Sequence, residues 1–245
     1  GLYTACCLQA SAVSPRKGHV VDRKELVAVL NQYGLGTPSS CQRVDHGHVN
    51  DTWIVSTETG TYVVRRRHPS LAMPQRVEAQ HALIQHLRGR GFPAPHVFTN
   101  RGGTTYIQNR GRLYEVHQYV SGSLVDTTDP DHVGAAATTL GCYHEAVKGF
   151  DHPAFHRRRE RYSIQTLARI VDRSMREWEG RLRAKARPLC TALVAHVKDL
   201  QEKIGEFTGL PQLVIHGDYY SENLIVRGKA VAAVVDYDQA RWSWR

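Results

Sequence analysis

Three polar side chains near the carboxyl end of the chain have the types and the spacing that phosphoryl transfer requires. They are Asp218, Asn223 and Asp236. Transfer of a phosphoryl group needs a carboxylate that orients the attacking hydroxyl and accepts its proton, and it needs oxygen ligands that hold Mg²⁺ against the nucleotide phosphates. Asp218 is the candidate for the first task, and Asn223 and Asp236 are the candidates for the second.

The sequence around these residues predicts how they are positioned. Asp218 and Asn223 lie five residues apart in a loop between two strand-like patterns, which is the H-x-D-x-x-x-x-N spacing of kinase catalytic loops. Asp236 follows the apolar run 230–235, so a strand would deliver this carboxylate in the place of the aspartate of the kinase D-F-G motif. The loop motif alone has many chance matches. The second aspartate, thirteen residues after Asn223, makes the constellation specific.

The stretch His216-Gly-Asp-Tyr-Tyr-Ser-Glu-Asn223, followed by Val235-Asp-Tyr-Asp238, resembles the superfamily of aminoglycoside phosphotransferases, choline kinases and homoserine kinases. Its members carry a pattern close to H-G-D-x-x-x-x-N and then I-D-[FYW]-[DE]. The resemblance covers about residues 20–245. It implies an α+β, protein-kinase-like fold with an antiparallel-sheet N-lobe and a mainly helical C-lobe. It also implies a small-molecule kinase that uses ATP and Mg²⁺, with Asp218 as catalytic base and Asn223 and Asp236 as metal ligands.

The same resemblance implies phosphate contacts in the N-terminal half. The turn 45–53 is similar to the phosphate-covering turn of sugar and homoserine kinases, which carry G-x-x-N-x-[TS]-[YFW], and this similarity assigns Gly47 and Asn50 to the nucleotide. Family members often place a lysine on the following strand, where this chain has Arg65. Arginine can still bind phosphate through two nitrogens. The next candidates for this contact are Arg66 and Arg67.

Two further nucleotide contacts follow from the resemblance. We expect Glu78, on a helix inserted between strands, to pair with Arg65 as the helix-C glutamate does in the implied fold. The stretch 115–122 is similar to a kinase hinge, so adenine would meet backbone groups near Gln118 and Val120.

Periodicity divides the chain into a strand-rich half and a helix-rich half. We expect residues 1–18 to be a disordered extension, residues 19–120 to form a nucleotide-binding N-lobe, and residues 121–245 to form a C-lobe with the catalytic loop and the metal-binding aspartate. Helices are predicted at about 22–33, 73–88, 129–148, 163–179 and 187–207, and strands at about 52–57, 61–65, 104–108, 112–120, 213–216, 224–226 and 230–235.

The composition is that of an ordinary globular protein with excess positive charge. A formal net charge of +9 suggests an anionic partner, which could be a nucleotide, a nucleic acid or a membrane surface. Five cysteines without C-x-x-C spacing argue against a disulfide framework or a zinc site and favour a reducing cytoplasm. We therefore expect a cytoplasmic protein whose partner is a hydroxylated small molecule, rather than a nucleic acid or a membrane.

Three other functions compete with a kinase. A catalytically weakened nucleotide-binding protein would account for Arg65 and for a turn with a single glycine. A metal-dependent hydrolase would use His216, Asp218, Asp236 and Asp238, but this cluster has one histidine and no H-x-H spacing. A nucleic-acid binder explains the net charge and leaves the Asp/Asn constellation unexplained. The sequence favours ATP-dependent transfer to a hydroxyl of the homoserine, amino sugar, choline or aminoglycoside class, and it does not identify the acceptor.

The carboxyl end carries two large aromatic residues, Trp242 and Trp244, within seven residues after Asp238. Such side chains at a terminus normally need a surface that covers them. Similar kinases continue there into helices that complete the acceptor site. We therefore expect the chain to be a fragment that lacks the end of its C-lobe.

Overall fold

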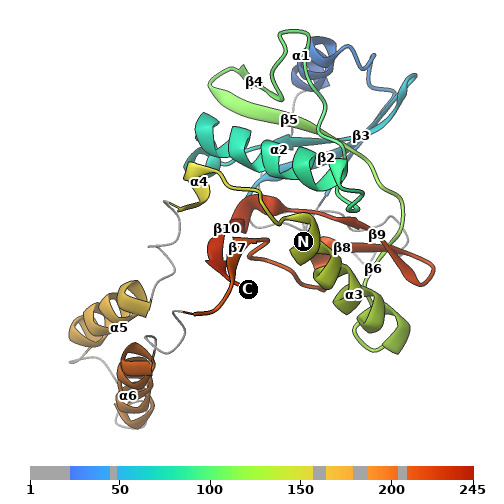
Figure 1. Cartoon of the computed structure of the whole chain (residues 1–245). Coiled ribbons are helices and arrows are strands. Elements are labelled where there is room, and N and C mark those ends of the chain that lie inside the picture. Colours follow the sequence, from blue (N-terminus) through green and yellow to red (C-terminus); the bar gives the residue numbers. More distant parts are fainter. Residues whose placement is uncertain (1–22, 45–48, 157–163, 179–186, 204–208) are drawn as a thin grey trace. The chain divides into compact units, whose positions relative to one another are not determined.

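The computed structural model describes residues 23–44, 49–156, 164–178, 187–203 and 209–245 of the 245-residue chain (Figure 1). By their contacts these residues form two compact units. The first holds the described residues up to Phe150 together with His216–Ala240, and the second holds Asp151–Ile215 and Arg241–Arg245. The lobe boundary that we expected near residue 120 lies inside the first unit and stays a prediction.

The first unit is built on an antiparallel sheet of five strands, in the order β1-β2-β3-β5-β4 (Figure 1). Consecutive strands β2 and β3 are joined by the two-residue turn that Glu58 and Thr59 make, and β4 and β5 by a turn at Arg110 and Gly111. The strands are β1 Ser40–Arg43, β2 Asp51–Thr57, β3 Gly60–Arg66, β4 Tyr106–Asn109 and β5 Arg112–Gln118.

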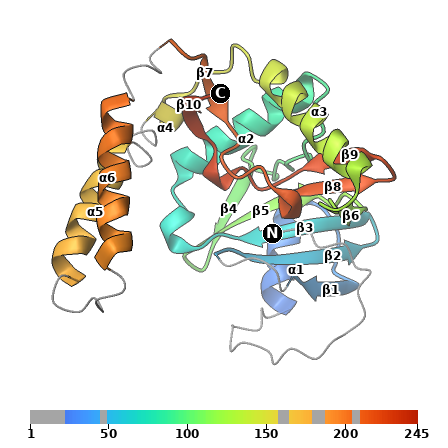
Figure 2. The same ribbon diagram turned by 90° about the horizontal axis from the view of Figure 1, so that it is seen from below.

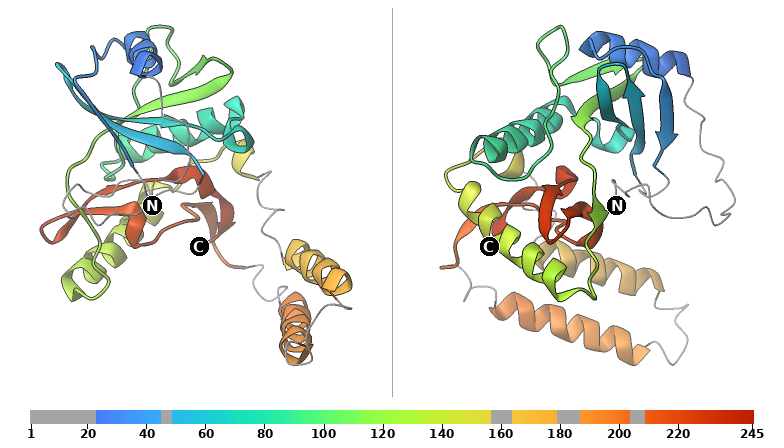
Figure 3. Two further views of the ribbon diagram at one scale, coloured as in Figure 1. Left: turned by 180° about the vertical axis from the view of Figure 1, so that it is seen from behind. Right: turned by 90° about the vertical axis from the view of Figure 1, so that its right-hand side faces the viewer.

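Helix α1 (Arg23–Tyr33) covers one face of this sheet because its apolar residues recur at helical spacing. The buried residues of α1 are Leu26, Val29, Leu30 and Tyr33. They pack on alternate strand residues, among them Trp53, Val55, Tyr62, Val64, Tyr114 and Val116. Helix α2 (Pro74–Gly89) lies on the opposite side of the sheet (Figures 1 and 3), and proline at its first position suits a helix start.

A second sheet of three strands carries the segments that matter for the site. Its order is β6-β8-β9, and the strands are β6 Ser123–Leu124, β8 Leu224–Arg227 and β9 Ala230–Val234. Helix α3 (Pro130–Ala146) begins at the capping residue Asp129 and lies beside β8 and β9 (Figure 2). The buried cluster Val63, Ile225, Ala233 and Val235, with Tyr119 and Val120 against it, joins the two sheets.

The second unit contains two helices and a strand pair. Helices α5 (Ile164–Trp178) and α6 (Arg187–Lys203) lie side by side (Figure 3), while β7 (Gln212–Ile215) pairs with β10 (Arg241–Trp244) in antiparallel register. The short helix α4 (Pro153–His156) packs near β10, where the His156 and Trp242 rings lie 4.6 Å apart. Trp242 also donates to Gln212 Oε1 at 3.0 Å, so local contacts half-bury this terminal aromatic residue.

Among the helices of the described ranges, none combines the length and the apolar character that crossing a membrane requires.

The tight approach of the segment before β6 to β8 yields a stability prediction. A Cβ added at Gly122 would lie 2.4 Å from Val226 O and 2.6 Å from Ile225 Cγ2, which are distances that require the backbone to move. We expect Gly122→Ala to lower the free energy of unfolding by about 1–3 kcal/mol, as overpacking typically does. Urea unfolding followed by circular dichroism measures this change.

The matched control is Gly134→Ala, at an exposed position inside α3 where an added Cβ meets nothing within 4 Å. There alanine should raise the free energy of unfolding by about 0.5–1 kcal/mol, because glycine loses more backbone entropy in a helix. Equal stability of the Gly122→Ala protein and the unaltered protein would contradict the close contact.

Candidate active site

The site begins with two arginines that the alternation of a strand turns to the same side. On β3, Tyr62 and Val64 face α1, so Arg65 and the following Arg67 project from the opposite face. On β5 the same alternation places Glu115 on the α2 side, directly across the strand from Arg65. Residues far apart in sequence are thus brought together by strand register.

Glu115 is the fully buried centre of this group. Its Oε1 lies 3.0 Å from Arg65 Nη1, and its Oε2 accepts from Arg67 Nε at 3.0 Å. The imidazole of His81, on α2, donates to Oε2 at 2.9 Å, and His117 Nε2 lies 3.4 Å from Oε1. Burial alone would raise the pKa of this carboxyl, but the charges of Arg67 and Arg65 and the two imidazoles hold it well below its usual value.

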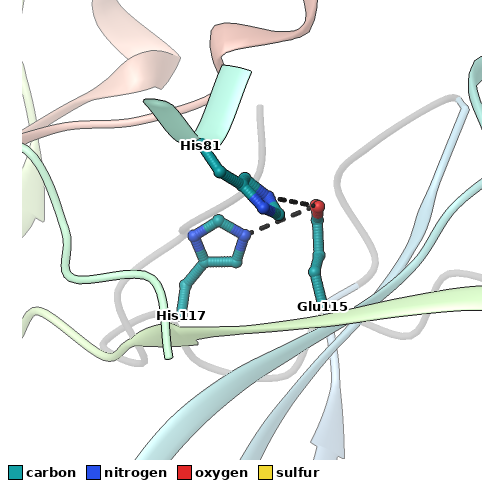
Figure 4. Close-up of side chains that lie close together, drawn as sticks. All are labelled: His81, Glu115 and His117. Carbon is teal, nitrogen blue, oxygen red and sulfur yellow. Dashed lines mark hydrogen bonds and ion pairs between the residues drawn. The ribbon is translucent and has the colours of Figure 1, made fainter. Parts of the chain in front are cut away.

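His81, Glu115 and His117 have the residue types of a metal site, and Figure 4 shows both imidazoles turned towards the carboxylate. Their ligand atoms lie within 4.8 Å of one another. Two guanidinium groups already neutralise Glu115 and would repel a divalent cation at this position. Burial also lowers the pKa of His117 to about 4. We interpret the cluster as two imidazoles packed around a buried carboxylate that the arginines neutralise, not as a metal centre.

Asp238 is the second carboxylate that the arginines hold. Its Oδ1 accepts from Arg67 Nη1 at 2.9 Å, and its Oδ2 accepts from Arg65 Nη2 at 2.8 Å and from Asn50 Nδ2 at 2.7 Å. Its backbone carbonyl accepts from Arg76 Nη2 at 2.6 Å. Burial opposes ionisation, but the charges of Arg65 and Arg67 hold the pKa of Asp238 well below its usual range.

Asp236 lies beside this pair and is compensated differently. It follows β9 in a left-handed backbone conformation, with φ 63° and ψ 73°, and its Oδ1 accepts from the Asp238 N–H at 3.3 Å. Arg65 Nη2 is 3.6 Å from the same oxygen, farther than from Asp238. Burial, together with the charge of Asp238, raises the pKa of Asp236 to about 6. Two arginines thus face three carboxylates, and the charge of Asp236 is the least compensated.

The loop from His216 to Asn223 positions Asp218 through backbone and side-chain hydrogen bonds. His216 Nε2 donates to Val235 O at 3.0 Å, and His216 Nδ1 accepts from the Asp218 N–H at 3.3 Å. Burial lowers the pKa of His216 to about 4, so this imidazole is neutral at pH 7 and can accept at one nitrogen while donating at the other. The histidine therefore joins the catalytic loop to the end of β9.

Asn223 is fully buried and is turned towards Asp218. Its Nδ2 donates to Asp218 O at 2.9 Å and to Asp218 Oδ2 at 3.2 Å, and its backbone carbonyl accepts from the Val235 N–H at 3.0 Å. Because the amide nitrogen is directed to Asp218, the amide oxygen is the atom of Asn223 suited to a cation. With the under-compensated carboxylate of Asp236 at the end of the neighbouring strand, this donor set fits Mg²⁺, which prefers oxygen ligands.

The residues that we expected to contact the nucleotide in the N-lobe differ in their positions and partners. Gly47 lies outside the described residues. Asn50 contacts Asp238 through Nδ2 and the His68 N–H through Oδ1. The expected pairing of Glu78 with Arg65 is wrong: Glu78 is exposed and accepts from Tyr106 Oη at 2.9 Å, whereas Arg65 pairs with Glu115. The reason is that Glu78 lies on an exposed part of α2 beside β4, whereas Arg65 projects from β3 towards β5.

The hinge residues lie where β5 ends. The exposed Gln118 donates its N–H to His96 O at 2.8 Å, so this donor is engaged within the protein. Val120 is half-buried and packs against the cluster that joins the two sheets. Arg66 points to the other face of β3, where it pairs with Asp51 at 2.8 Å.

Glu115 is the residue of this network that the sequence analysis did not single out. A signal was available, because Glu115 lies among the apolar residues Leu113, Tyr114 and Val116 in the middle of its strand, and buried charges need a partner. The three consecutive arginines at 65–67 indicated possible partners for this glutamate. Because every second residue of a strand faces the same side, Arg65 and Arg67 had to share one face.

Comparison with known proteins identifies the family. The sequence pattern of the family described as "Phosphotransferase enzyme family" matches residues 40–245, which contain the β3 arginines, the catalytic loop and both aspartates after β9. The chain belongs to this family. The predicted superfamily is thereby confirmed.

Curated relatives of this phosphotransferase-family chain are named homoserine kinase. The protein from Methylobacillus flagellatus is 25% identical over 213 residues, and the one from Caulobacter sp. is 27% identical over 217 residues. These alignments cover 85% and 87% of this chain, but 60% and 64% of the relatives. The chain thus spans less than two thirds of the length of these two relatives.

Solved structures of the same kind share the fold of this family member. An aminoglycoside phosphotransferase from Alicyclobacillus acidocaldarius aligns with a TM-score of 0.63 at 21% identity, covering 94% of this chain and 69% of that one. The amicoumacin kinase hAmiN, solved with AMP-PNP, Ca²⁺ and Ami, aligns with a TM-score of 0.64 at 14% identity, covering 85% of this chain and 61% of that one. The predicted α+β, protein-kinase-like fold is confirmed.

The neutral, buried His216 generates a prediction for the pH dependence of stability. Its pKa of about 4 in the folded chain is below the ordinary histidine value of about 6.5, so the unfolded chain takes up this proton first as the pH falls. The contribution of neutral His216 to the free energy of unfolding is fully present above about pH 6.5. It is lost as the pH falls towards 4, by roughly 1.4 kcal/mol per pH unit. Urea unfolding at several pH values should show that the free energy of unfolding changes less steeply with pH in His216→Gln than in the unaltered chain across this window. The same slope in both proteins would show that His216 is not buried in its neutral form.

Proposed function

We propose that this chain carries the nucleotide and metal sites of an ATP-dependent small-molecule kinase, which transfers the γ-phosphoryl group to a hydroxyl. The observation that supports this most directly is the arrangement of Asp218, Asn223 and Asp236. Asn223 hydrogen-bonds to Asp218 through its side chain and to the strand end before Asp236 through its backbone. One buried residue, Asn223, thus connects the candidate base to the strand end that precedes the candidate metal ligand.

Asp218 acts as the base in this proposal. Its half-buried carboxylate accepts the proton of the acceptor hydroxyl while that oxygen forms a bond to the γ-phosphorus. The bond between the γ-phosphorus and the bridging oxygen breaks, and ADP leaves with its electron pair. The hydrogen bond from Asn223 Nδ2 to Asp218 Oδ2 keeps the carboxylate in one orientation before the acceptor arrives.

Asn223 and Asp236 would hold the divalent cation. Mg²⁺, when bound, neutralises phosphate charge and orients the nucleotide. The charge of Asp236, which is the least compensated of the three carboxylates, supports its assignment as a ligand. The engagement of Asp238 by two arginines supports a different task for that residue. The amicoumacin kinase structure, which contains AMP-PNP and Ca²⁺, supports the use of a nucleotide and a divalent cation by this fold.

The nucleotide must lie outside the arginine–carboxylate network. The cavity that Arg65, Arg67, His117 and Asp236 help to line has about 10 Å³ of room, which holds one water molecule and no phosphate chain. Arg65 is 3% exposed, so a phosphate contact by its guanidinium stays a prediction that requires a rearrangement. Phosphate contacts by Gly47, which lies outside the described residues, and by Asn50 stay predictions as well. For adenine we retain the backbone near Gln118 and Val120.

The acceptor is assigned by class. The relatives named homoserine kinase support a small hydroxylated amino acid, and the amicoumacin kinase and aminoglycoside phosphotransferase structures support an antibiotic with hydroxyl groups. Both belong to the homoserine, amino sugar, choline and aminoglycoside range that we expected. Measuring ADP release with a panel of such acceptors identifies the substrate.

A catalytically weakened nucleotide-binding protein is the second candidate. The observation that favours it is the engagement of Arg65 and Arg67 by Glu115 and Asp238, which leaves phosphate recognition to other groups. Nucleotide binding without ADP release across the whole acceptor panel would select this alternative.

Divalent-metal dependence of nucleotide binding is the first test. We expect ATP with Mg²⁺ to raise the melting temperature more than ATP with EDTA, because a ligand that binds only the folded chain stabilises it by mass action. A thermal-shift titration at saturating nucleotide measures the difference. Equal melting temperatures under the two conditions would remove the metal from the proposal.

The role of Asp218 is the second test. With an identified acceptor, Asp218→Asn should lower kcat by roughly 10²–10⁴-fold, the usual loss when a positioned base is removed, while ATP affinity changes little. Glu222→Gln, at an exposed carboxylate in the same loop, is the matched control and should keep kcat. A similar kcat for Asp218→Asn and for the unaltered chain would exclude Asp218 as the base.

A further inference from the structure

The carboxylate of Asp238 is the point where the elements of the first unit meet. Asn50 reaches it from the start of β2, Arg65 from β3, and Arg67 from the residue after β3. Arg76 and Gln80, from α2, bind its backbone carbonyl at 2.6 and 3.4 Å. Asp238 lies two residues after Asp236, so whatever holds Asp238 also holds the loop that presents the candidate metal ligand.

Arg65 lies between two acidic residues and is closer to one of them. Its Nη2 is 2.8 Å from Asp238 Oδ2 and 3.6 Å from Asp236 Oδ1. Opposite charges in a buried site attract strongly, so without the charge of Asp238 this guanidinium would have Asp236 as its nearest partner on the loop. A close ion pair there would occupy the carboxylate that a divalent cation needs.

We propose that Asp238 is a positioning residue that holds Arg65 away from Asp236 and thereby keeps Asp236 available to the metal ion. This inference rests on the proposed function. Arg67 supports Asp238 on its other oxygen and anchors it to Glu115, which is fully buried. The four charges of Arg65, Arg67, Glu115 and Asp238 balance one another, and the charge of Asp236 is left for the cation.

Asn50 has a related task in this proposal. Its Nδ2 donates to the same Oδ2 that binds Arg65, while its Oδ1 accepts from the His68 N–H at 2.9 Å. Both ends of the amide are therefore engaged within the protein, one on the loop after β9 and the other just beyond β3. Asn50 thus fixes Asp238 from the β2 side and acts on the metal site through Asp238.

The experiment measures Mn²⁺ binding by electron paramagnetic resonance, with the full 245-residue chain and a saturating amount of AMP-PNP. Mn²⁺ serves as the probe because it takes the same oxygen ligands as Mg²⁺. Asp238→Asn should weaken Mn²⁺ binding by about tenfold, because Arg65 would then pair with Asp236 and reduce its attraction for the cation. A tenfold change corresponds to the electrostatic effect of a shift of one pKa unit. Circular dichroism confirms that each variant is folded.

The double variant Asp238→Asn with Arg65→Gln separates positioning from mere loss of structure. If Arg65 competes for Asp236, its neutralisation should restore most of the Mn²⁺ affinity that Asp238→Asn removes. A structural defect would instead deepen with a second buried substitution. Unchanged Mn²⁺ affinity in the single variant, or no recovery in the double variant, overturns the proposal.

Two milder pairs of variants keep the test decisive if Asp238→Asn does not fold. Arg67→Lys should weaken Mn²⁺ binding, whereas Arg66→Lys, at the neighbouring residue that faces Asp51, should not. Asn50→Ala should weaken Mn²⁺ binding, with Asp51→Asn as its control. If Asn50→Ala instead lowers the affinity for metal-free nucleotide, Asn50 binds phosphate and its positioning role is wrong.

The result for the unaltered chain distinguishes the two levels of the argument. If it binds neither AMP-PNP nor Mn²⁺, the proposed function fails and the positioning role falls with it. If it binds both, and Asp238→Asn and Arg67→Lys bind both equally well, the positioning role alone fails and the metal assignment to Asn223 and Asp236 stands.

Discussion

The site depends on the neutralisation of two buried carboxylates, Glu115 and Asp238, by the same two arginines. Each guanidinium contacts both carboxylates at 2.8–3.0 Å, so the four groups form a closed square of alternating charge. Removing one member of such a buried set leaves an uncompensated charge, which typically costs about 3–5 kcal/mol. The strand register of β3 and β5 and the conformation of the loop after β9 are therefore constrained together.

This constraint separates the tasks of two aspartates that lie two residues apart. Asp238 is ionised and bound within the protein, whereas Asp236 is half-buried with only a partial counter-charge and has a raised pKa. The left-handed backbone at Asp236 turns the chain so that both carboxylates face the arginines from one short segment. Such an arrangement suits a cation site, because the two arginines supply less positive charge than the carboxylates need for full neutralisation.

Family membership and local geometry contribute different parts of the account. The family match extends over residues 40–245 and the fold agrees with solved kinases, while the chain spans 60–64% of the length of the two homoserine kinases compared above. The acceptor that the names of the longer relatives give is therefore not transferred to this chain as an established property. The loop from His216 to Asn223 is different, because its contacts lie within the first unit. His216 and Asn223 hydrogen-bond to Val235, and both also hydrogen-bond to Asp218.

The sequence by itself determined the long helices, most of the paired strands and the motif of the loop from His216 to Asn223, because periodicity and motif are local properties. It missed β1, β6, β10 and α4, which have two to four residues and, unlike the equally short β7 and β8, no run of three apolar residues. The partners of Arg65 were decided by the tertiary structure alone. A local pattern placed Glu78 on a helix, but only strand register puts Glu115 opposite Arg65, and only the packing of α2 against the turn after β9 brings Asp238 within reach. Ion pairs between distant segments follow from the folded arrangement, which spacing along the chain does not encode.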